Sequence, residues 1–140
     1  MLVHFPVALL SVSLLWDGVG LVTAGSVWWA LSFWSLVVGL LAALPAAATG
    51  LVDYANLSVE TSAGSVATRH LLFTGAAITA YLVSLLIRQA PDPLQGRRLV
   101  AAVASSAVGL GLLAVGGHLG ALLVYEYGVG GSTDDGDESG

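Results

Sequence analysis

The sequence contains no cysteine and no lysine among its 140 residues. Without cysteine, the chain cannot form disulfides, thiolate metal sites, iron–sulfur clusters or the covalent attachment of c-type haem. Charged residues make up only 9% of the chain, whereas a soluble domain usually carries about 25%. The sequence also lacks a P-loop, a nucleophile elbow, a zincin motif and a basic patch for nucleic acid. These absences exclude most soluble enzyme classes and disfavour nucleic acid as a partner.

Hydrophobic residues make up 56% of the sequence, and the mean hydropathy is +0.89. A helix of about 20 apolar residues crosses a bilayer. Four such segments are present, at residues 2–22, 27–52, 69–87 and 99–125. We therefore predict an all-α, four-span transmembrane helix bundle that lies in the lipid bilayer of the cell membrane as a multi-pass protein. The membrane domain covers residues 1–129, and residues 130–140 form an acidic tail that we expect to be disordered.

The arginines indicate the orientation of the chain. Arg88, Arg97 and Arg98 lie between the third and fourth spans, and the other connections and ends carry only Arg69. Cytoplasmic loops carry an excess of basic residues, so we expect the third connection to be cytoplasmic. With four spans, both termini are then extracytoplasmic.

Histidine occurs three times, once on each of three spans: His4, His70 and His118. Along a helix, the path from His70 to Arg88 is about 27 Å and the path from Arg98 to His118 about 30 Å, close to the thickness of the hydrocarbon core. Both histidines are therefore predicted near the outer boundary. His4 begins the first span on the same side, and Asp53 ends the second, with Arg69 next to His70. We predict that these residues form one layer.

This layer has four interpretations. A pair of histidines, with His70 and His118 ranked first and His4 as the third candidate, binds haem b, and Arg69 pairs with a propionate. Alternatively, His4, His70, His118 and Asp53 hold a copper, zinc or iron ion. In the third interpretation the histidines handle protons. In the fourth they are interfacial residues bonded to water, the backbone or Asp53. We also expect Asp53 to accept a hydrogen bond from a histidine ring or to pair with Arg69.

Two further features concern packing. Asp17, near the end of the first span, is predicted to be an interfacial carboxylate or to bond a neighbour such as Ser13. The fourth span carries a stripe of small residues, of which Gly116 and Gly120 match a small-xxx-small pattern. We expect this face to pack against another helix, in this chain or in a partner. The remaining members of the stripe are Ala102, Ser105 and Gly109.

Several short motifs together resemble one known family. They are the opening Leu2-Val3-His4-Phe5-Pro6-Val7-Ala8-Leu9, the Ala46, Thr49, Gly50 and Asp53 pattern, the Arg69-His70 pair, and the segment from His118 to Gly130. In these motifs the chain resembles the prokaryotic membrane family catalogued as domain of unknown function 2231, over residues 1 to about 130. The resemblance implies a four-span membrane protein. Some members are fused to Rieske-type iron–sulfur domains, which implies a redox setting.

We therefore predict a haem b- or metal-binding electron-transfer subunit with its histidine site at the outer membrane face. The alternative is a non-catalytic structural or assembly subunit that anchors a larger membrane complex. In either case we expect the chain not to be an enzyme on its own. Because it has no cysteine, a redox partner such as a Rieske-type or cytochrome protein has to be a separate chain.

Overall fold

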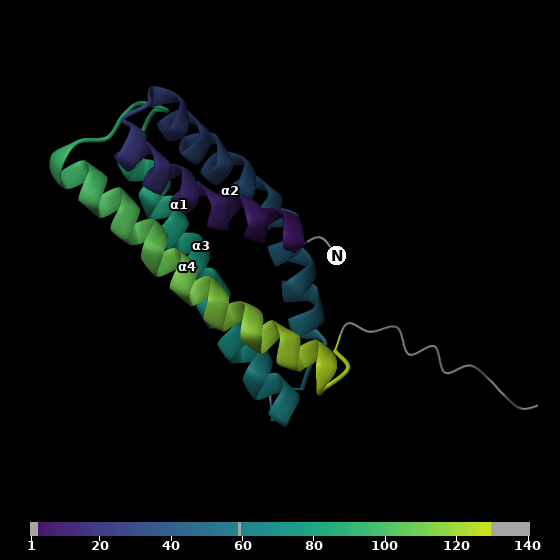
Figure 1. The fold of residues 1–140 in the computed structure, drawn as a ribbon. Helices are drawn as coiled ribbons and strands as arrows, with labels where there is room; N and C mark the ends of the chain where they lie inside the picture. The colour runs from purple at the N-terminus through teal and green to yellow at the C-terminus, as the bar shows by residue number, and fades with distance from the viewer. Residues whose placement is uncertain (1–2, 59, 130–140) are drawn as a thin grey trace, which may run out of the picture.

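The computed structural model describes residues 3–58 and 60–129 of the chain, and the predicted acidic tail lies outside these residues. The described chain folds into four helices: α1 (His4–Thr23), α2 (Ser26–Ala55), α3 (Ser62–Arg88) and α4 (Gly96–Tyr125), shown in Figure 1. Each is long and apolar enough to cross a membrane. The predicted all-α, four-span fold is therefore confirmed.

Hydrogen bonds with nearby side chains stabilise both ends of α3. The Thr61 side chain accepts a hydrogen bond from the backbone N–H of Gly64 and so caps the first turn of α3. This cap starts α3 well before the predicted span at residue 69. At the other end of α3, Gln89 adopts a left-handed conformation with φ 61°, and Arg98 Nη2 donates to the carbonyl oxygen of Ile87 at 2.7 Å. The arginine thus satisfies a free carbonyl at the helix terminus.

The bundle consists of two helical hairpins, α1–α2 and α3–α4. Within each hairpin the helices pack closely, and between hairpins α2 contacts α3 and α1 contacts α4. Helices α1 and α3 therefore lie diagonally across the bundle. The α1–α2 and α3–α4 connections share one end, which we call the arginine end because it carries Arg88, Arg97 and Arg98 (Figure 1). The opposite end, which carries His70 and His118, is called the histidine end.

Helix α1 is shorter than the others, with 20 residues against 30 in α2. The two are in register where Ser32 bonds the carbonyl of Ser13 and where Gly39 meets Leu10. Counting outward from the Leu10–Gly39 contact, His4 is level with residue 45, so α2 extends about 15 Å beyond the first residue of α1. Figure 1 shows α1 stopping short of the histidine end. Pro45 lies inside α2, where its missing N–H favours the bend seen in that helix.

Two apolar clusters form the core. One is centred on Leu10, Leu36 and Tyr81 in the middle of the bundle, and the other on Trp29, Leu94 and Ala102 at the arginine end. Leu94 belongs to the α3–α4 connection, so this loop closes the arginine end. Many large apolar side chains on the outer surface are exposed, as expected for helices whose outer faces contact lipid.

Candidate functional site

His70 is the one predicted site residue that the structure places between two helices. Its ring Nδ1 lies 2.7 Å from the carbonyl oxygen of Gly116 on α4. A carbonyl oxygen can only accept, so Nδ1 must carry the proton and donate it. In the neutral ring, Nε2 then keeps its lone pair. The side chain is half-buried, and the backbone of α4 fixes both its orientation and its tautomer.

Glycines on α4 make this close approach possible. A Cβ atom at Gly120 would lie 3.0 Å from Cε1 of His70, and one at Gly116 would lie 2.8 Å from Oγ1 of Thr74. The predicted Gly116/Gly120 face is therefore a packing face, and its partner is α3 of the same chain. Closer to the arginine end, the buried member of the stripe is Ser106 and not the predicted Ser105. Ser106 extends the packing face of α4 towards Ala102.

His118 lies on α4 at the same level along the bundle as His70 on α3. It is not on the face of α4 that packs against His70. It lies two residues from both Gly116 and Gly120, and at about 100° per residue its side chain leaves the helix on a different side. The side chain is exposed. Within one chain, the structure therefore does not bring His70 and His118 face to face.

The other predicted site residues are also apart. His4, Asp53 and Arg69 are all exposed. Because α1 begins short of the histidine end, His4 lies about 12 Å from the level of Asp53 along the bundle, outside the expected layer. Over residues 3–58 and 60–129, no three histidine, cysteine or acidic side chains gather closely enough to hold a metal ion. Nor does Asp53 form a hydrogen bond to histidine or a salt bridge in this part of the chain.

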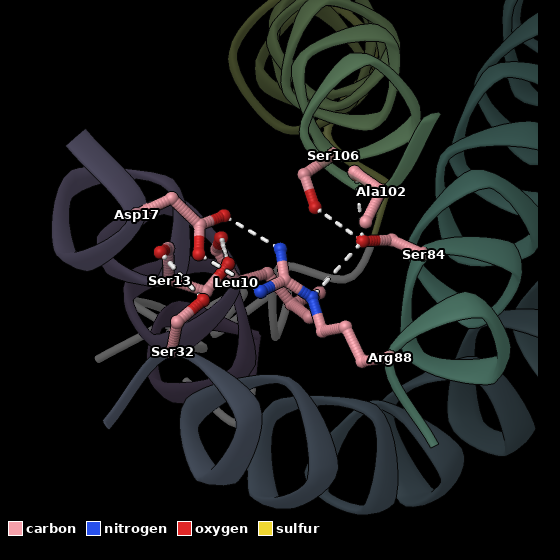
Figure 2. A network of polar contacts seen from close by, with 8 residues as sticks. All are labelled: Leu10, Ser13, Asp17, Ser32, Ser84, Arg88, Ala102 and Ser106. Atoms are coloured by element: carbon pink, nitrogen blue, oxygen red, sulfur yellow. Dashed lines mark hydrogen bonds and ion pairs between the residues drawn. The ribbon is translucent and has the colours of Figure 1, made fainter. Parts of the chain in front are cut away.

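A second polar site lies at the arginine end and contains more hydrogen bonds than the His70 site. The guanidinium of Arg88 donates from Nη1 to Asp17 Oδ1 at 2.8 Å and from Nη2 to Asp17 Oδ2 at 2.6 Å. The side chains are 2% and 0% exposed, respectively. Arg88 is the last residue of α3, and its side chain turns back into the bundle and crosses to α1 (Figure 2). The prediction of an interfacial Asp17 was therefore wrong.

Each helix contributes one fully buried serine near this ion pair: Ser13, Ser32, Ser84 and Ser106. Their hydrogen bonds form two groups, one between α3 and α4 that includes Arg88 and one between α1 and α2. The hydroxyl of Ser84 donates to the carbonyl of Ala102 and accepts from Ser106 and from Arg88 Nε. Ser32 donates to the carbonyl of Ser13, whose own hydroxyl donates to Leu10 (Figure 2). Every serine proton in these two groups is therefore donated to a protein acceptor.

Sequence reasoning missed this site for an identifiable reason. The sequence predicts Arg88 in a cytoplasmic loop, because positively charged residues concentrate at one membrane face. A weak signal was present, since Ser13 with Asp17 and Ser84 with Arg88 both have the i, i+4 spacing that puts two side chains on one helix face. The pairing of these two faces depends on how the hairpins pack, which the spacing does not specify.

Comparison with known families identifies the chain. The model of the family described as "Predicted membrane protein (DUF2231)" matches residues 1–133. The protein belongs to the DUF2231 family. The resemblance inferred from the short motifs is thereby confirmed, and so is its place as a multi-pass membrane protein. No curated protein and no solved structure matches this DUF2231 chain. The family description names no activity.

Proposed function

We propose that this DUF2231 protein is a membrane-embedded electron-transfer subunit that binds haem b or a transition metal through Nε2 of His70. The observation that supports the proposal is the hydrogen bond from His70 Nδ1 to the Gly116 carbonyl. Histidines that ligate metals usually donate their other ring N–H to a carbonyl or carboxylate, which fixes the tautomer and the ring orientation. Among the three histidines, His70 alone has such a partner within the described chain.

The remaining predicted residues take narrower roles in this proposal. Arg69 precedes His70 and is exposed, so it is available to pair with a haem propionate. His118 is on another side of α4 and His4 at another level, so a second axial ligand has to come from outside this bundle. That requirement agrees with a subunit that works beside a separate Rieske-type or cytochrome chain.

An absorption spectrum tests the proposal directly. The protein is produced in cells supplied with haem, purified in detergent, and measured oxidised and then reduced, with its metal content determined in parallel. We expect a reduced haem α-band or a bound transition metal, lost in His70→Ala and retained in the matched variant His118→Ala. A colourless, metal-free wild-type preparation would contradict the proposal, as would equal loss in both variants.

The second candidate is a structural or assembly subunit. What favours it is that all four buried serine hydroxyls near Asp17 and Arg88 donate to acceptors within the protein, and three of these bonds join two helices of the bundle. This function predicts that the protein migrates in a larger complex on native gels of membranes, and that His70→Ala leaves this complex unchanged. Dependence of the complex on His70 would instead favour the ligand-binding function.

A further inference from the structure

The two hairpins are joined unevenly along the bundle. At the arginine end, the Asp17–Arg88 pair links α1 to α3, and both apolar clusters include residues from both hairpins. Towards the histidine end, the last buried residues of the first hairpin are Pro6 in α1 and Ala43 in α2. Contact between the hairpins is therefore concentrated in one part of the molecule.

Beyond Ala43, α2 continues for residues 44–55, which we call the α2 arm. None of its residues is buried, and α1 reaches only its base. Pro45, at its base, has no N–H and so cannot form the helical hydrogen bond to the preceding turn. The arm is about 18 Å long. It thus combines a weakened base with little packing along its length.

One side-chain hydrogen bond connects the arm to the second hairpin. The hydroxyl oxygens of Tyr54 and Thr68 are 3.0 Å apart, and Thr68 donates its own proton to the carbonyl of Gly64 at 2.9 Å. Tyr54 is therefore the donor and Thr68 the acceptor. A single bond of this kind contributes about 1 kcal/mol, which is small enough for thermal opening.

The second hairpin is well packed at the same level. Gly64, Ala67, Gly116 and Leu123 are buried there, and the His70–Gly116 hydrogen bond links α3 to α4. The difference between the two hairpins therefore confines any opening to the α2 arm.

We propose that the α2 arm is a gate that pivots at Pro45 and separates from α3 at the histidine end, while the Asp17–Arg88 pair clamps the hairpins at the arginine end. The closed position is the one in which Tyr54 bonds Thr68. Opening uncovers the face of α3 that carries Thr68. The gate does not depend on His70 binding a ligand, since the His70–Gly116 bond lies within the hairpin that stays fixed.

Distance measurements between spin labels test the gate, and the absence of native cysteine makes labelling selective. One pair, at Val52 and Leu72, joins the arm to α3, and a reference pair, at Val27 and Val100, joins the hairpins at the arginine end. All four positions are exposed. In lipid nanodiscs we expect the arm distribution to be about twice as wide as the reference distribution, with a population at longer distance.

Two variants and a control complete the test. Tyr54→Phe should enlarge the long-distance population of the arm pair and leave the reference pair unchanged. Pro45→Ala, which restores the helical N–H, should narrow the arm distribution. Tyr125→Phe removes an exposed hydroxyl elsewhere and should change neither pair. Arm and reference distributions of equal width, or an arm pair unaffected by both Tyr54→Phe and Pro45→Ala, would overturn the proposal.

Discussion

Replacing Asp17 by asparagine removes the negative charge of the buried pair and keeps the shape of the side chain. Arg88 remains positively charged, because a guanidinium does not lose its proton in proteins. Its Nη atoms then face a neutral amide where they faced two carboxylate oxygens at 2.8 and 2.6 Å. Asp17 is 0% exposed, so bulk water does not contact this side chain in the folded protein. The variant therefore leaves a buried charge without its partner.

The cost follows from the burial of the pair. Breaking a fully buried ion pair by removing one partner costs about 3–5 kcal/mol in soluble proteins. In a membrane the unfolded reference state retains helices and lets polar groups find other partners, which reduces the measured effect. We therefore expect Asp17→Asn to lower the free energy of unfolding by about 3 kcal/mol, roughly a hundredfold in the folding equilibrium.

The assay is reversible unfolding of the purified protein from detergent or bicelles into sodium dodecyl sulfate, followed by tryptophan fluorescence. Trp29, only 5% exposed, reports on the arginine end itself. Asp92→Asn makes the same chemical change in the exposed α3–α4 connection and should alter stability by less than about 0.5 kcal/mol.

A double variant separates loss of the pair from loss of an isolated charge. Asp17→Leu combined with Arg88→Met removes both charges, and replacing a buried pair by apolar residues of similar size is often neutral or stabilising. We expect this variant to be more stable than Asp17→Leu alone by about 2 kcal/mol or more. If Asp17→Asn behaves like Asp92→Asn, or if the double variant is no better than the single one, the pair does not clamp the hairpins.

Three further predictions concern the packing of α3 on α4, the buried hydroxyl of Tyr81 and the orientation of the chain in the membrane. Gly116→Ala should lower the unfolding free energy by about 1–3 kcal/mol, because its Cβ would lie 2.8 Å from the Thr74 hydroxyl oxygen. Gly117→Ala, whose Cβ has nothing within 4 Å, should not lower it, and equal effects of the two variants would argue against close packing of α3 on α4 at Gly116. Tyr81→Phe removes a buried hydroxyl for which the described residues offer no hydrogen-bond partner, so it should raise the unfolding free energy by about 1 kcal/mol, and a loss of stability would reveal a partner. An impermeant thiol reagent applied to intact cells should label a cysteine introduced at Asn56 and not one at Gln95, while the reverse pattern would place the arginine end outside the cell.

The sequence by itself was enough to predict the number of helices and their membrane setting. Long apolar runs separated by breaks such as Pro91-Asp92-Pro93 leave few alternatives, because a bilayer accepts only segments whose backbone polar groups are satisfied internally. The shared level of His70 and His118 also followed from counting, since the rise per residue in a helix is constant. The early start of α3 was missed because the stretch 62–68 is not apolar, and its helix depends on the Thr61 cap.

Only the tertiary structure decided which faces meet. A helix that is apolar nearly all round gives no sequence signal for the side that packs, so the outward position of His118 and the inward position of His70 could not be predicted. The level of His4 depends on the register of α1 against α2, which the Ser13 and Gly39 contacts set. The Asp17–Arg88 pair joins residues far apart in the chain, and its formation requires two hairpins to pack with their polar faces inward. Composition and helical rise are local properties of the chain and can be read from it, whereas facing and register arise from packing between segments and exist only once the hairpins have come together.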